Sequence, residues 1–329
     1  MSVLVTGGAG YIGSHMVLAL AERGEEVVVL DNLSTGVRGA VAAEARFIEG
    51  DVGDGALLDR LMAEHRFDAV IHFAGSIVVP DSVSDPLVYY LNNTSNARTL
   101  IASAVKAGIP RFIFSSTAAV YGNPQSLPIL EDAPTAPISP YGSSKLMTEW
   151  MLRDAHAAYG LDYIALRYFN VAGADPERRV GQMSPRATHL VKVACQAALG
   201  LRPTLEVFGT DYPTADGTCL RDYIHVSDLV AAHLDALSYL RDGGASAVLN
   251  CGYGRGYSVL EVIAAVERAI GGALPVTLAP RRDGDPAAII AGAERAKRLR
   301  GWQPRFDAID VIVKTALDWE RKLQRRDAA

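Results

Sequence analysis

Short runs of apolar residues alternate with longer amphipathic stretches through the first half of this chain, and this alternation restricts the fold more than any other feature. Nearly continuous apolar runs predict strands at residues 2–7, 26–32, 45–51, 68–75, 111–117 and 162–170. The stretches between them predict helices at residues 11–23, 55–65, 92–107 and 140–159. Such strands are typical of parallel sheets covered on both faces, and helices between them make right-handed crossovers. The sequence therefore predicts an α/β fold with a doubly wound parallel sheet.

A glycine-rich turn, "TGGAGYIGSH" at residues 6–15, lies between the first predicted strand and the first predicted helix. Gly7, Gly10 and Gly13 permit a tight turn and a close approach of the backbone to a pyrophosphate at a helix N-terminus. A strand–helix turn without a ligand would carry the same spacing, so the glycines alone leave both interpretations open.

An acidic residue at the end of the second predicted strand favours the interpretation with a ligand. The Asp31 carboxylate is placed to accept the two hydroxyls of an adenosine ribose, and a 2′-phosphate there would meet like charge. Asp51, after the third strand, either contacts the adenine edge or is a solvated turn residue. "FAG" at residues 73–75 leaves room for a cofactor at the carboxyl edge of the sheet. We therefore predict a Rossmann-type domain that binds NAD rather than NADP.

The rhythm of the chain changes after residue 170. Residues 209–218 and 281–288 predict turns and loops, whereas residues 225–240 predict a helix and residues 247–252 a strand that returns to the first sheet. We expect two domains. The NAD-binding domain comprises residues 1–170 and a returning segment of about 222–251, and the smaller substrate-binding domain comprises residues 171–221 and 252–329.

Composition excludes several classes of partner. The formal net charge of −5 argues against a nucleic-acid or anionic-membrane surface. No run of eighteen apolar residues is present to span a bilayer, and the N-terminal residues do not resemble a secretion signal. Three cysteines without a CxxC pair fit free thiols in a reducing cytoplasm. The seven histidines show no metal-ligand spacing, so we expect no metal.

Tyr141 and Lys145 lie four residues apart at the start of a predicted helix. Ser139 is a suitable N-cap and Pro140 a suitable first helical residue, so the phenol and the ammonium should share one helix face. A Tyr at a helix start and a solvated Lys would give the same pattern by chance. The pair therefore needs a neighbour before it indicates chemistry.

That neighbour is a hydroxyl, from Thr117 or Ser116, at the end of the fifth predicted strand. A hydroxyl, a phenol and an ammonium near a nicotinamide form a site for carbinol oxidation, in which Tyr141 takes the proton. Acting at neutral pH requires the pKa of a phenol to fall by roughly 3 units, and one nearby cation supplies about 1–3 units. We expect Lys145 and the positive nicotinamide together to lower the pKa of Tyr141.

With these elements in order, the chain resembles an extended short-chain dehydrogenase/reductase, and more narrowly the UDP-glucose 4-epimerase family. The likeness covers nearly the whole chain, and residues 211–229 are its most specific part. The motifs that carry it are "GGAGYIGSH", "LDNLSTG", "EGD", "VIHFAG", "NNT", "FIFSSTAAVYG", "SPYGSSK", "LRYFN", "DYPTADGTCLRDYIHVSDL" and "APRRDGD".

The resemblance implies a tightly held NAD that serves as a catalyst, a UDP-sugar substrate and a homodimer. It implies that Tyr141, Thr117 and Lys145 are catalytic, and that Tyr141 and Thr117 also contact the sugar. The implied cofactor contacts are Gly7, Gly10, Tyr11, Ile12, Gly13, Asp31, Asn32, Asp51, Val52, Phe73, Ala74, Gly75, Asn93, Tyr141, Lys145 and Tyr168. The implied nucleotide-sugar contacts are Asn170, His189, Phe208, Arg221, Arg282 and Asp285. The dimer is expected to form through the helices at 92–107 and 140–159.

Three residues depart from the family pattern. Ile77 replaces a lysine that many relatives place near the cofactor phosphates. Ile289 is intermediate in size at a position that walls the sugar pocket, so UDP-glucose, UDP-N-acetylglucosamine and UDP-xylose all stay open as substrates. Gly292 stands where an aspartate is usual.

Two other functions compete with a 4-epimerase. A nucleotide-sugar dehydratase would carry an acid pair after Thr117, where this chain has Ala118 and Ala119. A protein that senses NAD(H) without chemistry would lack the Tyr-Lys pair or the arginines suited to a pyrophosphate, and this chain has both.

Overall fold

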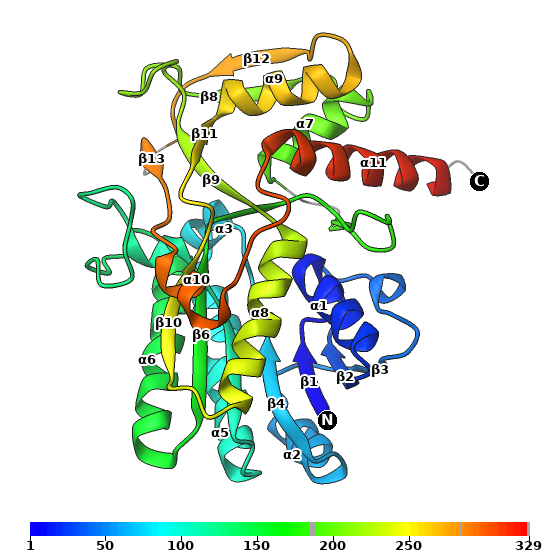
Figure 1. Ribbon diagram of the computed structural model, residues 1–329, viewed down its shortest axis with the longest axis vertical. Coiled ribbons are helices and arrows are strands. Elements are labelled where there is room, and N and C mark those ends of the chain that lie inside the picture. Colours follow the sequence, from blue (N-terminus) through cyan, green and yellow to red (C-terminus); the bar gives the residue numbers. More distant parts are fainter. Residues whose placement is uncertain (185–187, 283–284, 328–329) are drawn as a thin grey trace.

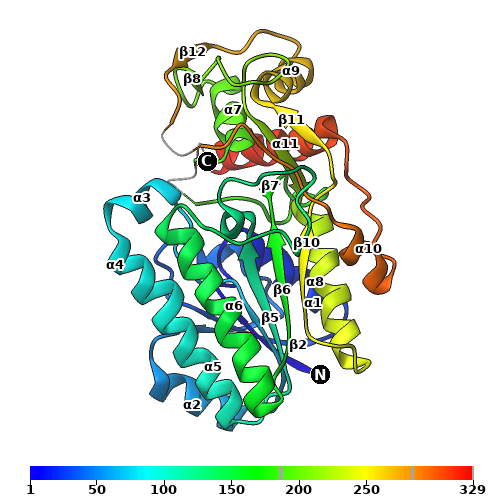
Figure 2. The ribbon, with the colours of Figure 1, turned by 90° about the vertical axis from the view of Figure 1, so that its left-hand side faces the viewer.

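The computed structural model describes residues 1–184, 188–282 and 285–327. Seven parallel strands form a large sheet in the order β10-β6-β5-β4-β1-β2-β3 (Figures 1 and 2). They are β1 (Ser2–Thr6), β2 (Glu26–Asp31), β3 (Arg46–Glu49), β4 (Phe67–His72), β5 (Arg111–Thr117), β6 (Asp162–Tyr168) and β10 (Ala247–Cys251). The order reverses between β1 and β4. Ligands of doubly wound sheets bind at such a reversal, outside the carboxyl ends of the strands.

Helices cover both faces of this sheet (Figures 1 and 2). One layer holds α2 (Gly55–Glu64), α5 (Asn96–Lys106) and α6 (Pro140–Tyr159), and the other holds α1 (Tyr11–Glu22), α8 (Val226–Arg241) and α10 (Glu294–Arg300). Within β1, Leu4 packs in the first layer, whereas Val3 and Val5 pack in the second, because side chains alternate along a strand. A strand covered on both faces has no polar side, which explains its continuous apolar run.

A smaller part of the molecule lies above the carboxyl ends of the large sheet (Figure 1). Its strands are β7 (Asn170–Ala172), β9 (Leu220–His225), β11 (Gly256–Ser258) and β13 (Ala288–Ile289), with β8 (Leu205–Phe208) pairing β12 (Val276–Ala279). Helices α7 (Leu190–Ala198), α9 (Val259–Ile270) and α11 (Ile309–Asp327) share a separate apolar core with these strands. A capping box between Ser258 and Glu261 begins α9.

The structure confirms the strands and helices predicted in the first half, except that the strand predicted at 162–170 ends at Tyr168 and Asn170 already begins β7 of another sheet. The helix predicted to begin at residue 92 instead begins with a π-helical turn, η2 (Tyr90–Ser95), that leads into α5. Two short helices before this turn, α3 (Val79–Ser84) and α4 (Pro86–Tyr89), were not predicted. The predicted later helix and strand are α8 and β10, and both pack on or join the large sheet.

Two predictions for the later part of the chain have a different outcome. The loop predicted at residues 281–288 includes 283–284, which lie outside the described residues, and Ala288 already begins β13. The segment assigned to the smaller domain contains α10, yet α10 packs against α8 and β10. The division into two domains stays a prediction. Within the described ranges, no helix is long and apolar enough to cross a membrane.

Candidate active site

The glycine loop forms a backbone cradle between the ends of β1 and β4. Gly7 has a φ of +73°, and a Cβ atom there would lie 2.5 Å from the Ala74 nitrogen. A Cβ atom on Gly13 would lie 2.1 Å from the Gly7 oxygen, so both positions require glycine. Gly10 begins α1 in an extended conformation without a side-chain cap, which leaves the first amides of α1 for an anion. This cradle fits the pyrophosphate of a dinucleotide.

Two carboxylates mark the ends of the next strands. Asp31 is buried and accepts hydrogen bonds from the amides of Ala9, at 2.9 Å, and Leu33, at 2.8 Å. The first of these bonds ties the end of β2 to the glycine loop. The side-chain amide of Asn32, which follows β2, donates to the carboxylate of Asp51, which follows β3, at 2.8 Å. Each of these side chains therefore fixes the position of the other. The fixed carboxylate of Asp31 beside the cradle fits an adenosine ribose.

Residues 73–75 follow β4 and lead to Ser76, which is held by Asn93, a residue that is 2% exposed. The Asn93 Oδ1 atom accepts from the Ser76 amide at 2.7 Å, and its Nδ2 atom donates to the Ser144 hydroxyl at 3.1 Å. A Cβ atom on Gly75 would lie 2.9 Å from Asn93 Oδ1. Asn93 therefore joins this loop to α6, and its contact with a cofactor stays a prediction.

The remaining residues predicted to contact the cofactor surround the same reversal of strand order. Tyr11 lies in the first turn of α1, and its hydroxyl donates to the Gly173 oxygen at 2.6 Å. Ile12 and Tyr168 pack against the core of the α1 layer, and Val52 is buried in the other layer. Burial raises the pKa of Tyr168, so this phenol stays protonated.

Tyr141, Lys145 and Thr117 lie together at the carboxyl end of β5. The helix start predicted at Ser139 is confirmed, because its hydroxyl accepts from the Gly142 amide at 3.2 Å and caps α6. Tyr141 is 8% exposed, Thr117 7% and Lys145 3%. The interpretation of a solvated lysine is therefore wrong.

Without a cofactor, the protein groups around Tyr141 raise the pKa of its phenol. Burial raises it, and a hydrogen bond from the Thr117 side chain acts in the opposite direction. The Lys145 ammonium donates to the Ser115 oxygen at 3.0 Å and lies 5.0 Å from the centre of the Phe114 ring, and its effect on Tyr141 together with a nicotinamide stays a prediction. Burial also lowers the pKa of Lys145 to about 8. The protein groups alone thus keep the phenol protonated at neutral pH.

Four of the predicted nucleotide contacts meet in the smaller part of the molecule. Arg221, on β9, pairs with Asp285, which follows β12. The Asp285 amide donates to the Arg282 oxygen at 3.3 Å, and the Arg282 guanidinium lies 3.7 Å from the centre of the Phe208 ring. Two guanidinium groups, a carboxylate and an aromatic ring suit a pyrophosphate, a ribose and a base.

Asn170 and His189 lie in other contacts. Asn170 begins β7, which pairs with β9 at Tyr223. His189 precedes α7, and its Nδ1 atom lies 2.7 Å from the Gln182 amide nitrogen. Burial lowers the pKa of His189, so the ring is neutral. None of the described contacts of His189 reaches the group around Arg221.

The structure gives the surroundings of two of the three departures, Gly292 and Ile289. Gly292 donates its amide to the Ile129 oxygen at 2.7 Å, and a Cβ atom on Gly292 would lie 2.5 Å from Leu130 Cδ2. A side chain at residue 292 would therefore require the Leu130 side chain to move and would crowd the Ile129 oxygen, 3.1 Å away. Ile289 pairs with Arg221 along β13 and β9, next to the predicted nucleotide contacts. Ile77 is 52% exposed, and nothing in the structure explains it.

The sequence interpretation missed a buried ion pair behind the reacting groups. Arg167, on β6, donates from Nε to Glu149, on α6, at 2.9 Å, and the two side chains are 7% and 4% exposed. Ser116, next to Thr117, also donates to Glu149. Glu149 lies one turn beyond Lys145 on the same helix, and this i, i+4 spacing was the signal available in the sequence.

Comparison with known proteins places this site in a class. Residues 3–252 match the model of the "NAD dependent epimerase/dehydratase family", the class that the sheet and the Tyr141 site define. Within the described residues, no group of three or more His, Cys, Asp or Glu side chains is arranged to hold a metal.

More specific relatives narrow the class. The chain is 61% identical over 323 residues to the UDP-glucose 4-epimerase of Azospirillum brasilense, covering 98% of this chain and 93% of that protein. It superposes on the Brucella ovis UDP-glucose 4-epimerase in complex with NAD with a TM-score of 0.94, at 45% identity and covering 96% and 97% of the chains. For the Bifidobacterium longum enzyme in complex with NAD+ and UDP, the TM-score is 0.92 at 39% identity, covering 98% of each chain. The chain belongs to the UDP-glucose 4-epimerase family, and the predicted Rossmann-type, NAD-binding fold is confirmed.

Proposed function

We propose that this protein interconverts UDP-glucose and UDP-galactose by inverting the sugar at C4, with NAD held throughout the reaction. The observation that carries this proposal is the burial of Tyr141, Thr117 and Lys145 together, beside a cradle that only glycines permit. The glycine cradle and Asp31 would hold NAD, which would supply the acceptor and donor of the hydride at sugar C4.

The residues of the chain supply the proton chemistry and hold the substrate. Tyr141 takes the proton of the 4-hydroxyl at its phenolic oxygen and later gives it back to the C4 oxygen. Thr117 bridges the sugar hydroxyl and the phenol. Lys145, held by the Ser115 oxygen, presents its remaining N–H groups to the nicotinamide ribose.

The nucleotide end of the substrate stays bound while the sugar rotates to present its opposite face. In this proposal Arg221 and Arg282 bind the pyrophosphate, Phe208 packs on uracil and Asp285 accepts the ribose hydroxyls. Arg221 and Asp285 pair with each other at partly buried positions. Binding of the nucleotide would therefore exchange this ion pair for polar contacts with the ligand. Ala118 and Ala119 follow Thr117 without an acid, which opposes a dehydratase.

Purified protein tests this proposal directly. We expect bound NAD in its absorbance spectrum and conversion of UDP-galactose to UDP-glucose without added cofactor. The rates with UDP-N-acetylglucosamine and UDP-xylose are then compared with the rate for UDP-galactose. This comparison tests the sugar preference, which Ile289 beside Arg221 leaves open. Bound NAD(H) without turnover of any UDP-sugar would contradict the proposal and favour a sensor of NAD(H).

The charge of the cofactor should control the acidity of Tyr141. We expect the pKa of this phenol to be lower with NAD+ bound than with NADH bound, because the oxidised nicotinamide is positive and favours the phenolate. Phenolate absorbance as a function of pH measures the difference, with the Tyr141→Phe protein subtracting the other tyrosines. Equal pKa values in the two redox states would contradict this expectation.

We also propose that the protein is a cytoplasmic homodimer. All three cysteines are free and buried, which suits a reducing compartment. Large apolar side chains are exposed on adjoining elements beside α6: Val83 at 64%, Leu87 at 76%, Leu91 at 60% and Trp150 at 47%. A second copy that packs its own α5 and α6 here would cover them.

Light scattering tests the dimer. We expect a dimer mass at micromolar concentration, and a monomer for the Leu87→Glu/Leu91→Glu protein, because two charges would be buried in the interface. Leu278→Glu is the matched control, since Leu278 is 66% exposed on β12 and should leave the mass unchanged. A monomer mass for the unaltered protein would refute the proposal.

A further inference from the structure

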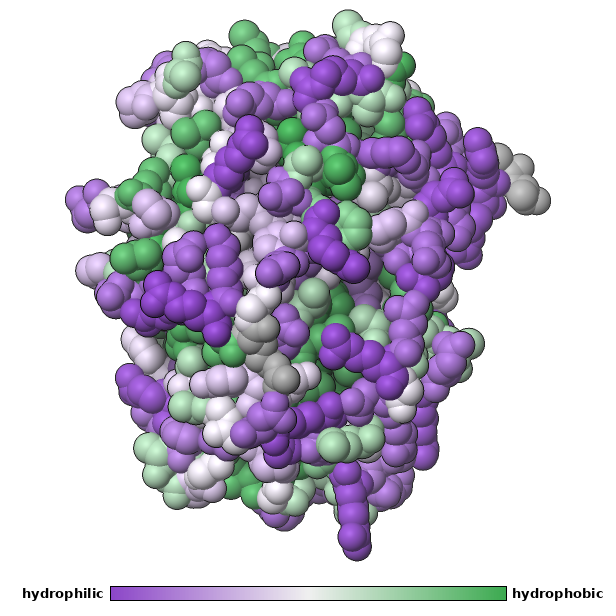
Figure 3. Space-filling view, viewed as in Figure 1, coloured by the Kyte–Doolittle hydropathy of each residue, from purple (hydrophilic) through white to green (hydrophobic). Residues whose placement is uncertain are grey.

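A strongly basic hollow lies between the last turns of α11 and the loop that follows β7. It has a volume of about 430 Å³. Its lining consists of Arg178, Asp318, Arg321, Lys322, Arg325 and Arg326. Among the described residues the lining thus has five cations and one carboxylate, although the chain as a whole has a net charge of −5. The surface over this end of α11 is among the most hydrophilic in Figure 3. None of these residues takes part in the site around Tyr141.

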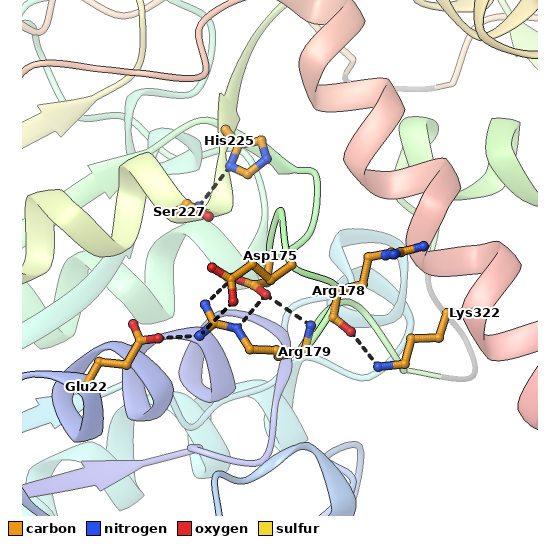
Figure 4. Close-up of polar contacts among 8 residues, drawn as sticks. Glu22, Asp175, Arg178, Arg179, His225, Ser227 and Lys322 are labelled. Carbon is orange, nitrogen blue, oxygen red and sulfur yellow. Dashed lines mark hydrogen bonds and ion pairs between the residues drawn. The ribbon is translucent and has the colours of Figure 1, made fainter.

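The wall opposite α11 is rigid. The Arg178 amide donates to the Asp175 oxygen at 2.8 Å, closing a turn. The Asp175 carboxylate accepts from Arg179 at both the amide, at 3.0 Å, and Nε, at 2.9 Å, and the Arg179 guanidinium also pairs with Glu22 on α1 (Figure 4). The Lys322 ammonium donates to the Arg178 oxygen at 2.6 Å and so joins this turn to α11 (Figure 4). The turn that carries Arg178 is therefore held against α11 without a ligand.

Two features of the hollow are energetically unfavourable, and the fold does not require either of them. Arg178 has a φ of +60°, a conformation that is uncommon for a residue with a long side chain. Arg321 and Arg325 are like charges at i, i+4, as are Lys322 and Arg326, and such pairs destabilise a helix. The helix dipole favours cations at the end of α11, but it gives no reason for Arg178, which comes from a separate loop. A bound anion would offset the repulsion between these cations.

We propose that this hollow binds a small oligophosphate, meaning a molecule with two or more adjacent phosphate groups. Guanidinium groups pair with phosphate oxygens through two parallel hydrogen bonds, and Lys322 adds a point charge. The volume falls in the range of small-molecule pockets, about 300–1,000 Å³. The carboxylates of Glu22 and Glu177 beside Arg179 border the loop and oppose a long polyanion such as nucleic acid.

Calorimetric titration of the NAD-loaded protein with tripolyphosphate at low salt tests this proposal. The Arg325→Gln/Arg326→Gln protein should bind roughly tenfold to a hundredfold more weakly than the unaltered protein, because two charged hydrogen-bond donors are lost. Arg60→Gln/Arg66→Gln is the matched control. Both of its arginines are exposed at or just after α2, and the net charge changes equally, so binding should be unchanged. Arg178→Gln tests the opposite wall and should also weaken binding.

Three outcomes would overturn the proposal. The first is absence of tripolyphosphate binding to the unaltered protein, and the second is equal binding by the unaltered and Arg325→Gln/Arg326→Gln proteins. The third is tighter binding of duplex DNA or anionic vesicles than of tripolyphosphate, with the same dependence on these arginines. Circular dichroism establishes that each variant is folded before its affinity is compared.

Discussion

Replacing Tyr141 by phenylalanine lowers kcat for UDP-galactose by a factor of about 10²–10⁴, the contribution typical of a positioned acid–base group. The substitution removes one oxygen atom and keeps the aromatic ring, which is 8% exposed at the start of α6. Nothing else in the proposed mechanism takes the proton of the sugar hydroxyl. Thr117 remains in place, but the pKa of an alcohol is too high for it to act as the base.

The control for this experiment is Tyr159→Phe. Tyr159 ends the same helix and is 70% exposed, so its hydroxyl should have no part in turnover. NAD absorbance of the purified Tyr141→Phe protein shows whether the cofactor is still held, which separates loss of chemistry from loss of the site. Full activity of the Tyr141→Phe protein would remove the base from the mechanism.

Replacing Arg167 by methionine destabilises the fold by about 3–5 kcal/mol, because it leaves the Glu149 carboxylate buried without its cation. The Glu149 side chain is 4% exposed and also accepts from Ser116, so water cannot take the place of the guanidinium. Urea denaturation measures the loss as a shift of the midpoint. Since Glu149 joins α6 to β5 and β6 behind Lys145, we also expect weaker retention of NAD.

The matched control breaks an ion pair at the surface. Arg268→Met removes the partner of Asp310, where the two side chains are 57% and 61% exposed, and should change stability by less than about 1 kcal/mol. Equal effects of the two substitutions would show that Glu149 is neutralised or solvated when Arg167 is lost.

The large sheet was predictable because the constraint on it is local. The central strands β1, β4 and β5 are buried on both faces, so they are continuous apolar runs in the sequence, and Ser139 with Pro140 marks the start of α6. The packing of α10 on α8 was not predictable in this way. It depends on contacts between residues far apart in the chain, such as the bond from Trp302 Nε1 to the Asp228 oxygen. The spacing of apolar residues in the sequence does not reveal such contacts.

The site shows the same division between local and distant causes. The positions of Tyr141, Lys145 and Thr117 follow from the helix period and from the end of a strand. The direction of the Lys145 ammonium does not, because the Ser115 oxygen that accepts from it belongs to another element. For the same reason the role of Glu149, which pairs with Arg167 on β6, was missed.

The position of β10 beside β6 has a consequence for synthesis on the ribosome. β6 is complete at residue 168, but its outer partner spans residues 247–251, so its free edge stays open while the intervening chain is made. An open, apolar edge strand pairs readily with other chains. The growing polypeptide is therefore most prone to aggregate between these two points, and a nascent chain released in that interval should depend on chaperones more than the finished protein does.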